Sequence, residues 1–422
     1  MNLLIRGGLV VDTEPVPGAT GDTDVLIGDG KIVQTGTGLA APPDAEVIEA
    51  DGMIVLPGFV DTHRHTWQAA LRAATPDMTL PEYVELVLNG YAPLYRPEDI
   101  YQGNLAGALD ALNHGVTTFL DWSHVQRSAE TTEAAIAGLA ESGVRGIFGY
   151  CHGADGDVLP AARHARDALP AGMPMVIAAM GPEFIGPERA RHEWAAAREL
   201  GVPVSAHLGG HGAETALQGL EFLQAEGLVE GTTFIHPNHY DDEALKRIAG
   251  AGGTASISPI TEAGLSIGYP ATGRLLAAGI PASFSADSPA GGPSDMFEIM
   301  RAAYLLERAR PDGAGLGFTT RDALRLATMG GAEVLGMAGT VGSLKPGKQA
   351  DLLLVRAEPS VADPVATLVL TARAADVDTV LVGGAVVKRG GELLGRPAVD
   401  LGETVRYLAQ SNSSRSSAGS QR

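Results

Sequence analysis

The sequence predicts an α/β protein: a (β/α)8 TIM barrel together with a small composite β-sandwich domain formed from both chain ends. Two observations carry this prediction. In the middle of the chain, apolar runs of strand length alternate with helical stretches eight times, whereas both ends show short strands separated by turns. Repeated strand-then-helix units form parallel sheets, and eight of them close into a barrel. Periodicity alone also leaves open a doubly wound, open sheet.

The eight predicted barrel strands are short apolar runs, and the segments between them are rich in Ala, Leu, Glu and Arg. Such runs, bounded by turn residues, are typical of buried parallel strands. The predicted strands are Gly58–His65, Thr117–Val125, Arg145–Gly153, Met175–Gly181, Val204–Gly209, Thr232–His239, Thr254–Thr261 and Ala282–Ser288. Helices are predicted between them, among others at Glu130–Ser142, Pro187–Leu200, Asp242–Ala249 and Asp295–Arg308.

Turn residues divide the two ends of the chain into short strands. The turns at residues 28–30 and 51–52 each separate two apolar runs and predict hairpins, as does the glycine pair at 383–384. Neither end has enough strands to close a sheet alone. We therefore expect residues 1–57 and 342–408 to form one domain, with the barrel, residues 58–341, inserted between them. Residues 409–422 are rich in Ser, Gly and Gln and predict a disordered tail.

The composition limits the classes of partner. The 422 residues include 30 basic and 50 acidic side chains, a formal net charge of −20, which argues against nucleic acid and anionic membranes. The single cysteine, Cys151, allows no intramolecular disulfide and fits a reducing cytoplasm. The first residues do not have the pattern of a signal peptide, and no apolar run is long enough to cross a membrane. We expect a cytoplasmic protein with a small-molecule substrate.

Polar side chains cluster at the carboxyl ends of four predicted strands. His63 and His65 are two positions apart on the first strand, so both imidazoles point to the same side. The fifth, sixth and eighth strands end at His207, His236 and Asp287. Barrel active sites form at this end of the strands, and three imidazoles with a carboxylate suit a catalytic divalent ion. Such an ion would lower the pKa of its water from 15.7 towards about 7.

Three segments then carry a resemblance to a known family. They are PGFVDTHRH at residues 57–65, SADS at 285–288 and LKPGKQADL at 344–352. Together with His207 and His236, they resemble the amidohydrolase superfamily over essentially the whole chain, and most closely its cytosine deaminase and chlorohydrolase branch. The resemblance implies a (β/α)8 barrel with a composite β-sandwich, in agreement with the prediction from periodicity.

The resemblance also implies a mononuclear site. Zinc is the first choice of ion and iron(II) the alternative, bound by His63, His65, His207 and Asp287. Asp287 would also take the proton of the water, and His236 would contact the water or the substrate. Dinuclear branches need a carboxylated lysine on the fourth strand, and this chain has no lysine between residues 32 and 245. Relatives commonly form dimers or larger assemblies, so a homo-oligomer is expected.

The fifth strand departs from the pattern of the family. Deaminases of this branch often carry His-Leu-Ala-Glu there, and the Glu moves protons to a ring nitrogen. This chain has HLGG at residues 207–210, followed by HGAE at 211–214, so two registers are open. We take His207 as the ligand because an apolar strand directly precedes it. His211 or Glu214 would then supply the proton transfer from the loop, or that role is absent; Glu214 also fits a first-turn helix charge.

Further side chains at strand ends are candidates for binding the substrate. Aromatic rings near a barrel mouth often stack on a planar ligand, although they can equally cap the core. The candidates are Trp67, Trp122, His124, His152, Glu183, His211, His239 and Glu262.

These features predict a metal-dependent hydrolase. It would cleave a C–N bond of a small, nitrogen-rich cyclic substrate, by deamination or by opening a cyclic amide or amidine, with Asp287, His236 and Glu214 as catalytic residues. Removal of chloride or a metal-assisted lyase reaction is the alternative that the altered fifth strand keeps open. A catalytically silent binding barrel is a third possibility, against which the five intact site residues argue.

Overall fold

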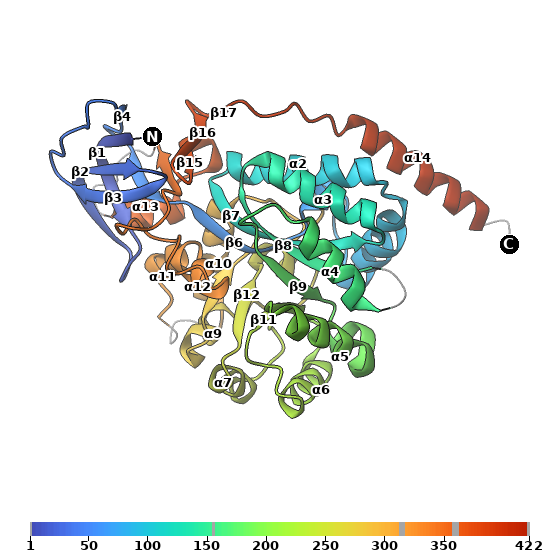
Figure 1. The fold of residues 1–422 in the computed structure, drawn as a ribbon. Helices are drawn as coiled ribbons and strands as arrows, with labels where there is room; N and C mark the ends of the chain where they lie inside the picture. The colour runs from blue at the N-terminus through green and yellow to red at the C-terminus, as the bar shows by residue number, and fades with distance from the viewer. Residues whose placement is uncertain (1, 154–156, 312–316, 357–362, 420–422) are drawn as a thin grey trace.

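The computed structural model describes residues 2–153, 157–311, 317–356 and 363–419 (Figure 1). Within them, one eight-stranded sheet forms a barrel and a nine-stranded mixed sheet lies beside it. In the described part of the chain, no helix has both the length and the apolarity needed to cross a membrane.

The barrel consists of eight parallel strands in sequence order, and this confirms the predicted fold class. Its two end strands meet through backbone hydrogen bonds: Asp287 N–H donates to the His63 carbonyl and His65 N–H to the Asp287 carbonyl, both at 2.9 Å. An open sheet is thereby excluded. The strands are β6 (Phe59–Arg64), β7 (Val116–Gln126), β8 (Arg145–His152), β9 (Met175–Ala179), β10 (Val204–His207), β11 (Thr232–Ile235), β12 (Thr254–Ile257) and β13 (Ala282–Phe284).

Helices surround the barrel, and local signals define their ends (Figure 1). Ser128 and Asp241 accept hydrogen bonds from the first-turn amides of α3 and α7, and Gly143 ends α3 in the left-handed conformation. The outer helices are α2 (Pro97–Asn113), α3 (Ala129–Ser142), α4 (Val158–Ala168), α5 (Pro182–Leu200), α6 (Ala213–Ala225), α7 (Asp242–Gly250), α8 (Pro259–Gly264), α9 (Thr272–Ala278), α10 (Met296–Ala309), α11 (Thr320–Leu326) and α12 (Met329–Val334). The predicted helices therefore form within a few residues of their expected bounds.

The second sheet is composite: it contains strands from both chain ends, as the short strands predicted there indicate. Strand β5 from the N-terminal segment pairs antiparallel with β14 from the C-terminal segment, and apolar side chains from both segments share one buried cluster. Its strands are β1 (Asn2–Asp12), β2 (Gly18–Gly28), β3 (Lys31–Gly36), β4 (Glu46–Glu49), β5 (Ile54–Pro57), β14 (Leu352–Val355), β15 (Val377–Val382), β16 (Ala385–Arg389) and β17 (Glu392–Leu393). Helix α13 (Pro364–Leu370) lies between β14 and β15 in the chain.

Two of the three predicted hairpins form, and the third prediction is wrong. Strands β2 and β3 pair across the turn at 28–30, and β15 and β16 across 383–384. Strands β4 and β5 do not pair with each other across residues 51–52; both pair in parallel with β1. The eleven-residue strand β1 is long enough to pair with β4 along Leu3–Arg6 and with β5 along Leu9–Val10. The turn therefore connects two strands that pair with the same neighbour, one after the other.

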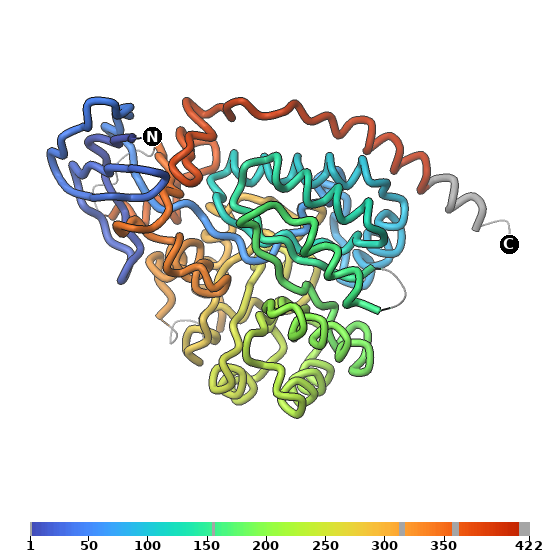
Figure 2. The backbone as a smooth tube through the Cα atoms, viewed as in Figure 1, coloured from blue at the N-terminus to red at the C-terminus, as the bar shows by residue number. Residues whose placement is uncertain are grey.

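The C-terminal segment also differs from its prediction. Residues 402–419 form helix α14 (Gly402–Gly419), which runs outward from the barrel in Figures 1 and 2, whereas a disordered tail was expected from residue 409. The start of the helix is anchored: Leu408 is 2% exposed, and the Thr404 hydroxyl donates to Asp99 at 2.8 Å. Once its first turns are held, each further residue adds a backbone hydrogen bond. Residues 420–422 lie outside the described residues.

A buried carboxylate holds the loop after β9. Glu193 of α5 accepts hydrogen bonds from the backbone amides of Met180 and Gly181, at 3.0 and 3.2 Å. Burial raises the pKa of Glu193 from its ordinary value of 4.5 to about 7. This loop leads directly to Glu183 and Phe184, so Glu193 fixes the start of the segment that reaches the barrel mouth.

Replacing Glu193 with Gln is expected to make stability less dependent on pH. Between pH 4.5 and about 7 the folded chain keeps a proton that the unfolded chain has released, so this group lowers the free energy of unfolding as the pH rises. The shift corresponds to roughly 3 kcal/mol. Urea unfolding at about pH 5 and pH 8 should show Glu193→Gln gaining stability relative to the wild type at the higher pH. Parallel pH profiles of the two proteins would contradict this role.

Candidate active site

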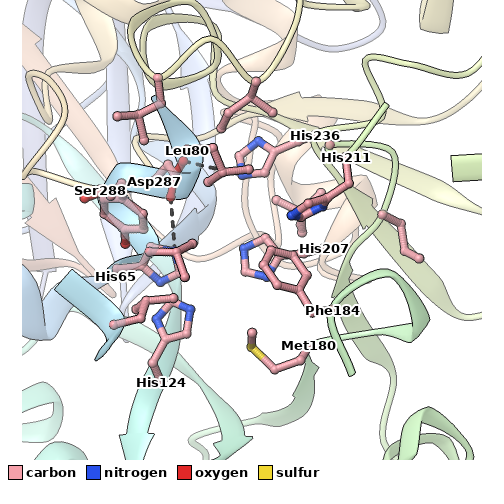
Figure 3. Close-up of a pocket in the computed structure, with 18 residues that line it drawn as sticks. His65, Leu80, His124, Met180, Phe184, His207, His211, His236, Asp287 and Ser288 are labelled. Carbon is pink, nitrogen blue, oxygen red and sulfur yellow. Dashed lines mark ion pairs between the residues drawn. The ribbon is translucent and has the colours of Figure 1, made fainter. Parts of the chain in front are cut away.

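The five residues predicted at the strand ends come together at the mouth of the barrel, and Figure 3 shows four of them, His65, His207, His236 and Asp287. Asp287 is at the centre. Its Oδ1 lies 3.3 Å from His63 Nε2 and 3.1 Å from His65 Nε2, and its Oδ2 lies 3.4 Å from His236 Nε2. His207 completes the group, with its ring centroid 5.0 Å from that of His63. The expected common direction of His63 and His65 is therefore present.

Two of these residues have an unusual backbone conformation. His236 and Asp287 follow β11 and β13 with φ angles of +61° and +57°. This left-handed region is uncommon for residues with a side chain and costs free energy, which surrounding contacts must offset. At Asp287, the backbone hydrogen bonds with His63 and His65 offset this cost. In this conformation, Asp287 Oδ2 lies 3.4 Å from His236 Nε2.

The geometry fits a bound divalent ion. Ligand atoms of His63, His65 and His207 lie within 4.8 Å of one another, as do those of His63, His236 and Asp287. Among the described residues, both ring nitrogens of His63 and Nδ1 of His207 are buried without a hydrogen-bond partner. Such atoms are costly unless something binds them. The cluster is a site for a divalent metal.

The electrostatics of the imidazoles agree with this fit. Burial lowers the pKa of His63 to about 3, although the nearby Asp287 carboxylate opposes the shift. Burial also holds the pKa of His207 well below its usual range. Metal ligation needs neutral imidazoles with free lone pairs. These two side chains are therefore in the protonation state that a cation requires.

Neighbouring groups orient two of the other imidazoles. His65 Nδ1 lies 2.8 Å from the Trp122 carbonyl, and His236 Nδ1 lies 3.0 Å from Glu262 Oε1. Each contact leaves Nε2 facing the centre of the site, an arrangement typical of residues behind metal ligands. Burial lowers the pKa of His236, but the hydrogen bond with Glu262 and the charge of Asp287 raise it to above its ordinary value.

The pocket above the cluster has a mostly apolar wall, and its cavity volume is small, about 30 Å³. Its lining residues are His65, Leu80, Tyr83, Val84, Leu88, His124, Met180, Phe184, His207, Leu208, Gly210, His211, Ile235, His236, Leu265, Ile267, Asp287 and Ser288.

Only two of the eight predicted substrate-binding residues line this pocket. His124 lies 4.1 Å from His65 between ring centroids, and His211 lines the wall near Phe184 (Figure 3). Glu262 instead supports His236, and Trp122 packs beneath the cluster with its ring 4.3 Å from that of His207.

The other predicted residues lie away from the pocket wall. Trp67 is buried against Tyr95 in the barrel shell, and Glu183 is buried beneath the loop after β10. His152 lines a neighbouring cavity, and His239 Nε2 bonds the Ile267 carbonyl at 2.7 Å.

Glu214 requires a correction as a catalytic residue. It is exposed in the first turn of α6 and does not line the pocket. In that position its charge complements the amino end of the helix. The register with His207 as the site residue is the one that the structure adopts, because β10 ends there.

Part of the pocket wall was not predicted. Leu80, Val84 and Leu88 come from α1 (Leu80–Tyr83) and the helical turn η2 (Val84–Tyr91), between β6 and β7. Their spacing of four residues would place them on one helix face, a signal present in the sequence. They close the pocket with aliphatic side chains.

Comparisons with known proteins agree with this site. A family model described as "Amidohydrolase family" matches residues 54–387. A 5-methylthioadenosine/S-adenosylhomocysteine deaminase from Desulforudis audaxviator is 32% identical over 419 residues, covering 93% of this chain and 95% of the relative.

Two solved structures share the fold. An adenosine deaminase from Xanthomonas campestris with bound zinc has a TM-score of 0.87 at 23% identity and covers 98% of both chains. A mutant atrazine chlorohydrolase from Arthrobacter aurescens, complexed with zinc and atraton, has a TM-score of 0.85 at 24% identity, covering 96% of this chain and 99% of the other. With the metal site and the matched family, these findings show that the chain is a hydrolase of carbon–nitrogen bonds and belongs to the amidohydrolase family.

Proposed function

We propose that this enzyme deaminates a small, planar nitrogen heterocycle with one divalent ion, zinc in the first place, held by His63, His65, His207 and Asp287. The observation that supports it most is the convergence of these four side chains, in which the described residues leave nitrogens of His63 and His207 without hydrogen-bond partners. Three of the four, His65, His207 and Asp287, line the pocket. The ligand set also suits iron(II).

A single ion is proposed because the fourth barrel strand, β9, has no lysine that could bridge two ions. Strand β9 reads MVIAA, and no lysine occurs between residues 32 and 245. A carboxylated lysine is thus not available to bridge two ions there.

The side chains around the site have distinct roles in the proposed reaction. When bound, the ion supplies an activated water molecule, by lowering the pKa of water towards about 7. Asp287 accepts the proton of the water. Its carboxylate is at the centre of the cluster, in contact with three imidazoles. His236, held through Nδ1 by Glu262, presents Nε2 towards the same carboxylate and orients the attacking oxygen. Burial of the whole cluster excludes bulk water and strengthens these interactions.

The wall of the pocket indicates the kind of substrate. Leu88, Phe184 and Ile267 line it, and none of the lining residues is Lys or Arg. Apolar walls favour a flat, uncharged ring, and a pocket without a cation offers nothing to an anionic tail. Aminated purine-type rings are the first substrates to test, because the 32% identical relative is named as a deaminase of adenosine derivatives.

Metal analysis tests the centre of the proposal. The purified chain should contain about one equivalent of zinc or iron, and His63→Ala and His207→Ala should each lose it together with activity. The exposed His164→Asn, on α4, is the matched control and should keep the ion. Two equivalents in the wild type, or full occupancy in His207→Ala, would contradict the single-ion site.

A substrate panel tests the reaction. Aminated and chlorinated heterocycles would be incubated with the metal-loaded enzyme, and ammonia and chloride measured. Ammonia release supports deamination. Chloride release without ammonia would instead favour the dechlorinating alternative, and turnover of neither would argue against both.

We also propose that the enzyme acts in a reducing cytoplasm as a homo-oligomer without nucleic-acid or membrane partners. The buried free Cys151 and the net charge of −20 support the compartment and the absence of polyanionic partners. Light scattering after size-exclusion chromatography would test the oligomer; a mass of 43.5 kDa would identify a monomer.

A further inference from the structure

The pocket wall holds two imidazoles that the proposed reaction does not use. His65, His207 and Asp287 are assigned to the ion, and His236 is paired with Glu262. His124 and His211 remain. His124 is buried with its Nδ1 unpartnered among the described residues. His211 differs from it in two ways: its side chain is 29% exposed, and a carboxylate lies behind it.

That carboxylate belongs to Glu183, in the first turn of α5. Its side chain is fully buried, its Oε1 accepts a hydrogen bond from Gly209 N–H at 2.6 Å, and its Oε2 lies 3.6 Å from His211 Nδ1. Oε2 has no hydrogen-bond partner among the described residues. A buried carboxylate oxygen in that state is costly. His211 Nδ1 is placed to satisfy it with a small closure, and such bonds are often long before substrate binds.

The loop after β10 is shaped to bring His211 to this place. Gly209 has a φ of +96°, and a Cβ there would lie 2.7 Å from the Tyr240 ring and 2.8 Å from Pro237 Cα. A side chain at this position is therefore excluded. Gly209 N–H instead bonds Glu183, and the Phe184 ring packs edge-on against His211 with centroids 4.1 Å apart (Figure 3). The same two neighbouring residues thus hold both the loop and the imidazole.

We propose that Glu183 and His211 form a carboxylate–histidine pair that delivers the proton to the leaving nitrogen. This inference rests on the deamination proposed above. Glu183 is the positioning residue: it accepts Nδ1–H and leaves Nε2 as the working atom. As an imidazolium, His211 donates its Nε2–H to the amino group as the C–N bond breaks, so that ammonia leaves and the ring is left neutral with its proton on Nδ1. His211 then regains a proton from solvent, to which it is open, while Asp287 releases the proton of the water to solvent. The sum is water plus amine giving hydroxyl plus ammonia.

Two single variants test the pair in the metal-loaded chain. His211→Ala and Glu183→Gln should each lower kcat for ammonia release about 100-fold or more, with little change in KM and an unchanged metal content. Gln keeps an acceptor for Gly209 N–H but cannot act as the carboxylate. Glu188→Gln, an exposed pair partner of Arg191 on the same helix, is the matched control. An unchanged kcat in His211→Ala would overturn the proposal.

Rescue separates proton transfer from a structural role. Because His211 is partly exposed and lines the pocket, millimolar imidazole should restore much of the kcat of His211→Ala. Position 210 offers a second route: a Cβ there would lie 3.4 Å from Ile267 Cγ2 and 3.8 Å from His236 Cβ, which are ordinary contacts. Gly210→Glu should therefore restore activity in the His211→Ala background by placing a carboxyl in the pocket. Failure of both rescues would overturn the proposal.

A readout that needs no turnover keeps this inference apart from the proposed reaction. Nitrogen-15 NMR should find the neutral His211 ring protonated at Nδ1 in the wild type and a mixture of tautomers in Glu183→Gln. The same tautomer in both proteins would overturn the pair. If the tautomer changes but the wild type releases no ammonia from any aminated heterocycle, the failure lies in the proposed deamination.

Discussion

Asp287→Asn is expected to lower kcat roughly 1,000-fold or more while the chain keeps its fold, since general acid–base groups contribute about 10²–10⁴-fold. Asn has nearly the same shape and can still offer an oxygen to a cation. It cannot accept the proton that the attacking water loses. The three imidazole contacts of Asp287 make it the shared carboxylate of the site, so no neighbour in the cluster can replace it.

The measurement is steady-state ammonia release, together with metal content and circular dichroism. Asp242→Asn is the matched control, because Asp242 is an exposed carboxylate on α7 that pairs with Arg274 at 2.8 Å. A variant at position 287 that keeps its ion and turns over within about tenfold of the wild type would refute the role of Asp287 as the base.

Asp61→Ala is expected to cost about 3–5 kcal/mol of stability, the range seen when one partner of a buried ion pair is removed. Asp61 Oδ2 lies 2.9 Å from Arg64 Nε, and both side chains are buried on β6. Asp61 Oδ1 also accepts hydrogen bonds from the backbone amides of His63 and Ala286, each at 3.2 Å. The second of these crosses the seam where the first and last barrel strands meet.

Urea unfolding would measure the loss, and Asp61→Ala combined with Arg64→Met is the informative comparison. The double variant should recover part of the stability, because it removes the stranded guanidinium rather than leaving its charge buried. A loss below about 1 kcal/mol in Asp61→Ala would show that solvent reaches Arg64 and that the pair is not what holds the seam.

Local patterns were sufficient to predict the barrel and its metal site. Apolar runs and their flanking turns locate all eight strands, because a parallel strand buried on both faces needs an uninterrupted apolar stretch. The five site residues follow from their places at strand ends, since the carboxyl ends of a barrel's strands meet on one rim. Neither step depends on which distant side chains touch.

Partner choice between distant segments was not predictable in the same way. The turn at residues 51–52 has hairpin chemistry, yet β4 and β5 both pair with β1. The serine-rich end of the chain continues as α14 because Thr404 and Leu408 anchor its start on the barrel. In both cases a long-range contact outweighs a local preference, and such contacts leave no periodic trace in the sequence.

The sequence by itself determined the five polar residues that meet at the barrel mouth, whereas the tertiary structure decided which other side chains line the pocket there. Glu262 contacts His236 instead of lining the pocket for the substrate, Glu214 is exposed, and Glu183 lies behind His211. Alternation along a strand sets the face to which a side chain points. Its distance from a neighbour, and whether water reaches it, depend on how loops and helices pack, and local sequence patterns do not encode that packing.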